Sequence, residues 1–166
     1  MACSQTLAGL VQDCDTSMGG IKKVWIATEN PNPSTSDGAI VGFEQSTTWY
    51  QYNFKKGTSS FTSTLNVDPA NSINYVSTEL ILQFNKMTTT KRIEMAALAV
   101  NDMYVIVLDS NNTYWYLGMD EPVTASAGTS QTGTAKTDGN FYQVTLTDES
   151  DTFPYEVLET ALPFEA

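Results

Sequence analysis

Apolar and polar residues alternate through much of the chain, a pattern typical of strands with one face in a core and the other in water. In residues 59–68, SSFTSTLNVD, serine, threonine and asparagine separate Phe61, Leu65 and Val67. After a short turn a second apolar stretch follows at residues 73–84, so the pattern predicts a hairpin. Further strands are expected at residues 22–27, 39–43 and 47–54, on both sides of a turn at 109–112, and at 141–147 and 155–158.

Residues 90–101 depart from the alternating pattern. Ile93, Ala96, Ala97 and Val100 follow one another at spacings of three and four, with good helix formers between them. Threonines precede this stretch and can cap a helix by accepting backbone N–H groups. We therefore predict one α-helix here, with these four residues on its apolar face.

Two polar segments and an N-terminal arm complete the predicted organisation. Residues 28–38 and 120–140 are expected to be loops, the second one long and rich in small residues. Residues 1–19 are expected to form an arm that a Gly19-Gly20 turn joins to the first strand. Residues 1–166 are expected to form a single domain that is mainly β, a β-sandwich or barrel with one flanking α-helix.

The turn at residues 109–112 has an alternative interpretation as a calcium loop. Asp109, Asn111, Thr113 and Asp120 stand at positions 1, 3, 5 and 12 of the EF-hand template. The template requires a glycine at position 6, where this chain has Tyr114, and a bidentate glutamate at position 12. A β-hairpin turn is therefore the favoured interpretation.

The chain is strongly acidic, with a formal net charge of −11. Residues 1–83 carry seven acidic and four basic side chains, residues 84–166 carry twelve and four, and none from Gly139 onward is basic. Nucleic-acid binding requires lysine and arginine to displace counterions from phosphates, so direct binding to DNA or RNA is disfavoured. An acidic wall can instead repel a polyanion and let it slide past.

Catalytic and metal chemistry find little support in the residue types present. The chain has no histidine and only two cysteines, Cys3 and Cys14, so it lacks the ligands of a structural zinc site and a Cys–His nucleophile pair. We expect two free, partly buried thiols, with Cys14 packed beside the first strand. Asp148, Glu149 and Asp151 are expected in an exposed turn, with ordinary pKa values. The sequence therefore predicts a protein that is not an enzyme and has no cofactor and no metal site.

Aromatic residues on the predicted strands suggest an alternative role in binding carbohydrate or protein. Trp and Tyr side chains can stack on a ligand, but strand periodicity sends about half of them into a core. The residues concerned are Trp25, Trp49, Tyr50, Tyr52, Tyr114, Trp115 and Tyr116.

Several stretches resemble virion structural proteins of phages that infect Bacteroidetes, of the tail tube or tail-ring type. They are DTSMGGIKKVWIATEN at 15–30, with a cysteine before it, LAVNDMYVIVLDSNNTYWYLG at 98–118, GTAKTDGNFYQVTLTDES at 133–150 and FPYEV at 153–157. The resemblance covers most of the chain and rests on turn glycines and strand patterns. It departs from the expected pattern at Asn111-Asn112, where Asn-Gly is expected, and at Met119, where a further glycine is expected.

The resemblance implies a tail tube subunit that oligomerises into stacked rings and forms a conduit through which DNA passes without specific binding. The alternatives are a neck or head–tail ring, or a head-decoration or adhesion module that binds protein or glycan. Apolar anchors in the arm, the aromatic hairpin and the tail are the expected contacts with other copies and with other virion proteins. These interface candidates are Leu7, Leu10, Tyr114, Trp115, Tyr116, Val123 and Phe164.

The expected location is the virion tail, after synthesis in the host cytoplasm. The N-terminal sequence MACSQTLAGLVQ has no basic region followed by an apolar stretch, so we expect no signal peptide. No apolar run approaches the length of a membrane span.

Overall fold

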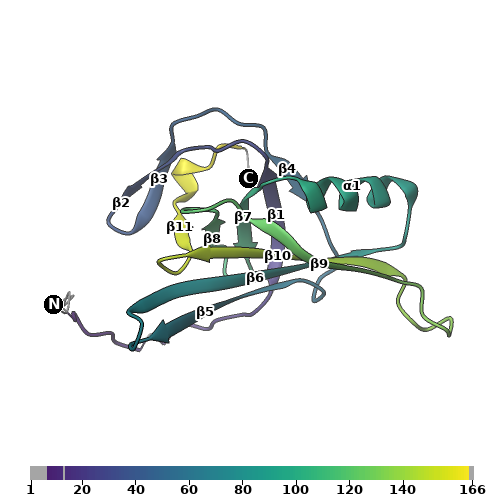
Figure 1. Ribbon diagram of the computed structural model, residues 1–166, viewed down its shortest axis with the longest axis horizontal. Coiled ribbons are helices and arrows are strands. Elements are labelled where there is room, and N and C mark those ends of the chain that lie inside the picture. The colour runs from purple at the N-terminus through teal and green to yellow at the C-terminus, as the bar shows by residue number, and fades with distance from the viewer. Residues whose placement is uncertain (1–6, 13, 165–166) are drawn as a thin grey trace.

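The computed structural model describes residues 7–12 and 14–164 and contains two β-sheets, one α-helix and one 3₁₀-helix (Figure 1). In chain order the elements are β1 (Ile21–Ala27), β2 (Pro33–Ser36), β3 (Ala39–Phe43), β4 (Tyr50–Tyr52), β5 (Ser60–Asp68), β6 (Ile73–Asn85), α1 (Thr89–Val100), β7 (Tyr104–Asp109), β8 (Tyr114–Leu117), β9 (Thr124–Gln131), β10 (Phe141–Ser150), β11 (Tyr155–Val157) and η1 (Glu159–Ala161).

The strands form a seven-stranded sheet in the order β2-β3-β11-β8-β7-β1-β4 and a four-stranded sheet in the order β5-β6-β10-β9. Neighbouring strands are antiparallel except β3 and β11, which run parallel. The two sheets pack on each other as a sandwich and are not closed into a barrel. The predicted fold class, mainly β with one helix, is confirmed.

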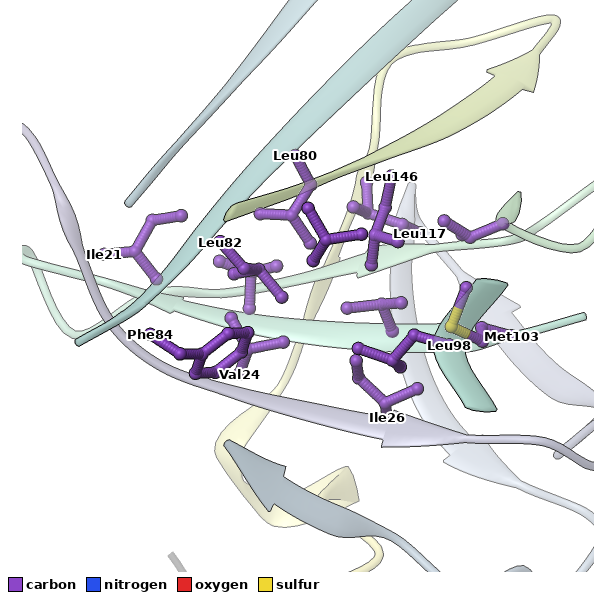
Figure 2. Packing of buried hydrophobic residues seen from close by; sticks show 14 residues of the cluster. Ile21, Val24, Ile26, Leu80, Leu82, Phe84, Leu98, Met103, Leu117 and Leu146 are labelled. Carbon is purple, nitrogen blue, oxygen red and sulfur yellow. The ribbon is translucent and has the colours of Figure 1, made fainter. Parts of the chain in front are cut away.

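The main core lies between the two sheets and follows from strand alternation. On β1, Val24 and Ile26 point toward the smaller sheet, where Leu80 and Leu82 of β6 and Leu146 of β10 meet them (Figure 2). All five side chains are 0 to 2 % exposed. Burial of this apolar area is the main favourable contribution to the stability of the sandwich.

A second core covers the opposite face of the seven-stranded sheet. Trp25 and Ile106, which alternate with the residues of the main core on β1 and β7, pack there with Tyr116 of β8 and Val157 of β11. The central strands β1, β7 and β8 are thus buried on both faces, which explains the nearly continuous apolar sequence YVIVL at 104–108.

The predicted helix is confirmed within one residue at each end, but its predicted apolar face is wrong. The Thr88 hydroxyl caps it by accepting the N–H of Lys91 at 3.3 Å. Leu98 is buried and Met95 packs against the main core, whereas Ile93 and Val100 are 57 % and 82 % exposed. The inward face follows the position of β9 and β10, which α1 contacts, and not the spacing of the β-branched residues.

The expected loops are shorter than predicted, because each contains a strand. Residues 33–36 form β2, and residues 124–131 form β9 within the segment 120–140. The strand predicted at 47–54 is limited to β4, at the edge of its sheet. Pairing with a neighbouring strand determines the conformation of these segments. Strand β9 has no apolar alternation of its own, but it pairs along most of its length with β10.

Candidate assembly site

The N-terminal arm carries the most exposed apolar side chains in the described part of the chain. Leu7, Leu10 and Val11 have relative exposures of 95 %, 103 % and 93 %. The arm has no helix or strand among the described residues before β1, and Figure 1 shows it leading away from the sandwich. The described arm therefore leaves apolar surface uncovered by its own chain, as the sequence predicts for Leu7 and Leu10.

The base of the arm is fixed to the turn between β7 and β8. The Met18 N–H donates to Asn111 Oδ1 at 2.8 Å, and Asn111 Nδ2 donates to the Met18 carbonyl at 3.1 Å. Gly20 has a φ of +106°, which favours glycine, and its carbonyl accepts the N–H and hydroxyl of Ser110. The chain bends at Gly20 just before β1, and these hydrogen bonds hold the base of the arm against the β7–β8 turn.

Asp109 organises the same β7–β8 turn through three N–H donors. Its Oδ1 accepts the backbone N–H groups of Asn111 at 2.7 Å and Thr113 at 2.9 Å, and its Oδ2 accepts Trp115 Nε1 at 3.1 Å. Asn112 adopts the left-handed conformation, with a φ of +66°. This arrangement matches the predicted hairpin turn. Both carboxylate oxygens of Asp109 already accept hydrogen bonds from the turn backbone or from the Trp115 indole.

Replacing Asp109 by alanine is expected to lower the free energy of unfolding by about 2 kcal/mol, because the carboxylate makes several hydrogen bonds, one of them to a half-buried indole. Urea unfolding followed by tryptophan fluorescence measures the loss. Asp102→Ala removes an exposed carboxylate just after α1 and serves as the control, with an expected change below about 0.5 kcal/mol. Equal losses in both variants would contradict this role of Asp109.

The aromatic hairpin contributes to the cores of its own subunit. Tyr114, Tyr116 and Val123 are 8 %, 1 % and 0 % exposed, and Trp115 is half-buried against the main core. Both faces of β8 are covered within the subunit, so Tyr114, Tyr116 and Val123 offer little surface to a neighbour in this conformation. Their predicted contact with other subunits stays a prediction.

Phe164 also packs within its own chain. Its ring stacks on Trp25 with a centroid distance of 4.4 Å and meets the Trp49 ring edge-on at 6.0 Å. The tail after η1 thereby helps to close the second core, and Phe164 keeps part of its surface exposed, so its predicted contact with a neighbouring subunit stays a prediction.

Asp148 is a buried acid that sequence reasoning placed in an exposed turn. Strand β10 extends to Ser150, and alternation puts Asp148 on the same face as Val144 and Leu146, with 3 % of its surface exposed. Its Oδ1 has no hydrogen-bond partner among the described residues. The period-2 series Val144, Leu146, Asp148 was the signal that could have identified it.

Burial raises the pKa of Asp148 to about 6, and the negative charges of Asp120, Glu121 and Glu149 add to the increase. A backbone N–H from Gly118 offsets part of the increase, because it stabilises the ionised form. Burial also raises the pKa of the Tyr116 hydroxyl, which Asp148 influences electrostatically. The pKa of Asp148 is thus raised, whereas the sequence predicts an ordinary value.

The remaining candidate groups do not converge on one site. Asp120 accepts the backbone N–H of Asp151 at 2.9 Å, and it makes no hydrogen bond to the turn that contains Asp109 among the described residues. Among residues 7–12 and 14–164, no group of three or more His, Cys, Asp or Glu side chains is arranged to hold a metal ion. Cys14 is exposed, so its predicted packing beside the first strand is wrong, and Cys3 lies outside the described residues.

Several hollows border α1, and two of them are relevant to ligand or partner binding. The first, of about 420 Å³, is lined by Trp49, Tyr50, Tyr52, Lys91 and Glu94 among others. The Tyr52 hydroxyl donates to Glu94 Oε1, and burial is the main cause of the raised pKa of Tyr52. This hollow collects part of the predicted aromatic set, whereas Trp25, Tyr114 and Tyr116 lie in the second core.

The second hollow is a groove of about 410 Å³ between α1 and β9. Met95 and Ala99 line it from the helix, Ala125 and Ala127 from β9, and Val144 from β10. Met95 and Ala125 also pack against the main core, so the floor of the groove is continuous with it.

Neither a scan against protein-family models nor searches of curated proteins and of solved structures return a match to this chain. No helix in the described segments combines the length and apolar composition needed to cross a membrane. The fold and the exposed arm define an acidic two-sheet β-sandwich with an uncovered apolar segment.

Proposed function

We propose that the protein is a structural subunit of a phage tail tube, which oligomerises into stacked rings and forms the conduit for genome delivery. The observation that carries the proposal is the arm, where Leu7, Leu10 and Val11 are each more than nine-tenths exposed. Contiguous exposed apolar side chains mark surfaces that a partner covers. A neighbouring copy of the chain supplies that cover, and the resemblance of residues 15–30, 98–118, 133–150 and 153–157 to virion proteins supports this class.

The charge of the chain suits a conduit. With a net charge of −11 per copy, a ring concentrates negative potential and repels DNA, so the genome slides through without specific binding. Other virion proteins are the expected partners at the two ends of the tube. The site of action is the virion tail, after synthesis in the host cytoplasm.

The purified full chain is expected to form rings or tubes in negative-stain microscopy and large species in light scattering. The double substitution Leu7→Ser and Leu10→Ser is expected to reduce the assembled fraction at least tenfold, because it removes apolar area that only a neighbour covers. Val41→Ser is the matched control, since Val41 is an apolar side chain of β3 with 44 % exposure. It is expected to assemble like the unmodified chain.

Other outcomes point to other functions. Rings that do not stack would replace the tube by a neck or head–tail ring. A chain that stays monomeric at high concentration and binds glycans through the hollow at Tyr50, with binding lost in Tyr50→Ala, would contradict the tube and favour an adhesion module. If the Leu7/Leu10 variant assembled like the unmodified chain, the arm would not be the assembly contact, and the main support for the proposed function would be lost.

A further inference from the structure

Strand β9 is an unprotected edge of the four-stranded sheet. Within the described chain β9 pairs with β10 on one side and has no strand partner on the other, although Val123, directly before it, forms a bridge with Met103. Natural edge strands are commonly protected by charged residues, proline or very short length. The eight residues of β9, TASAGTSQ, include no charged residue and no proline. This edge is therefore suited to pairing with an added extended segment.

The groove between β9 and α1 offers apolar contacts beside that edge. Its lining residues are all uncharged and include Met95, Ala99, Ala127 and Val144. Small side chains along β9 leave room for larger ones from a partner. An extended segment with leucine or valine side chains fits this combination of free backbone edge and apolar floor.

The charge distribution along the chain favours an uncharged segment of a second copy as the occupant of the groove. Two copies of a chain with a net charge of −11 repel each other unless they meet through uncharged surfaces. The two longest runs of the printed sequence without Asp, Glu, Lys or Arg are residues 1–12 and 122–135. The first contains the exposed residues of the arm, and the second contains β9.

We propose that residues 7–11 of one copy pair as an added strand with the β9 edge of the next copy, with Leu7 and Val11 in the groove between β9 and α1 and Leu10 on the opposite face of the extended sheet. The proposal deepens the proposed function and rests on it. Figure 1 shows the arm leaving the sandwich at the end opposite α1, so an arm and a groove on the same copy face different neighbours. Such a head-to-tail contact generates rings or filaments.

Cross-linking between differently labelled copies tests this contact. In a chain with Cys3 and Cys14 replaced by serine, one sample carries Val11→Cys, on the face of the added strand that meets the groove, and a second, isotope-labelled sample carries Ala127→Cys. The samples are mixed under assembly conditions and treated with a short bis-maleimide. We expect at least tenfold more cross-linked dimer of mixed isotope composition than in a control mixture with Thr64→Cys, which places the thiol on the exposed edge of β5.

The possible results distinguish failure of the groove contact from failure of the proposed function. A higher yield with Thr64→Cys would overturn the β9 groove and place the arm on β5. Assembly with no cross-link at either position would also overturn the groove, while the proposed function stands. A chain that remains monomeric at every concentration would overturn both.

Discussion

Replacing Asp148 by asparagine is expected to raise the free energy of unfolding at pH 8 by about 3 kcal/mol. Asp148 is 3 % exposed, and burial raises its pKa from the ordinary value of 3.8 to about 6. Above pH 6 the folded chain must hold this carboxylate ionised in a poorly solvated position, which opposes folding. Asparagine keeps the size of the side chain and an oxygen that can accept the Gly118 N–H, but carries no charge.

The pH dependence of the same variant provides a sharper measurement. Because the pKa of Asp148 is higher in the folded state, its protonation favours folding, and this contribution is complete below about pH 3.8 and lost as the pH rises through 6. The advantage of Asp148→Asn over the unmodified chain is therefore expected to shrink from about 3 kcal/mol at pH 8 to about 1.5 kcal/mol at pH 5. Urea unfolding at both pH values measures it.

Asp151→Asn is the matched control for this prediction. It makes the same chemical change three residues further along, at an exposed carboxylate. Its effect is expected to stay below about 0.5 kcal/mol at both pH values. A gain for Asp148→Asn that does not depend on pH would show that charge at this position is not the cause.

Hydrophobic periodicity predicted most of the fold because the periods of strand and helix differ. The strands β1, β3, β6 and β10 and the helix α1 all coincide with patterns of period two or of three and four. The turn at Asp109 was also predictable, because asparagine and aspartate tolerate the backbone that the turn requires. These features depend on residues close together in the sequence.

The missed features depend on contacts between distant segments. Strand β9 is made of small and polar residues, and it becomes a strand because β10 pairs with it. Asp148 was assigned to a turn because an acid is a poor strand residue, but β10 continues beside β6, where Asp148 is opposite Thr78. Local propensity has no information on such neighbours.

The candidate assembly site was predicted in part for a related reason. Leu7 and Leu10 precede the first strand and have no periodic partner, and they are exposed as expected. The aromatic residues of β8 satisfy the same chemical criteria for an interface, but both faces of that strand are already covered within the subunit. Composition identifies side chains that need cover, and only the tertiary structure shows which of them already have it.

Replacing Leu80 by alanine is expected to lower the free energy of unfolding by about 3 kcal/mol, within a usual range of about 2 to 5 kcal/mol for such changes. Leu80 is fully buried on β6, between Phe61 of β5 and Leu146 of β10 in the register of the sheet. It points into the main core opposite β1 (Figure 2). Because hydrogen-bonded strands hold β6 on both sides, the sheet cannot collapse into the space left by the leucine.

Leu65→Ala makes the same chemical change on β5, where the side chain is 46 % exposed, and is expected to cost less than about 1 kcal/mol. Leu80→Met keeps the volume of the core and is expected to cost less than about 1.5 kcal/mol. Chemical unfolding of the three variants at the same low protein concentration compares their stabilities. If Leu65→Ala cost as much as Leu80→Ala, the packing between the two sheets could not be the main source of the stability of the fold, whereas the expected order places that source in the sandwich core.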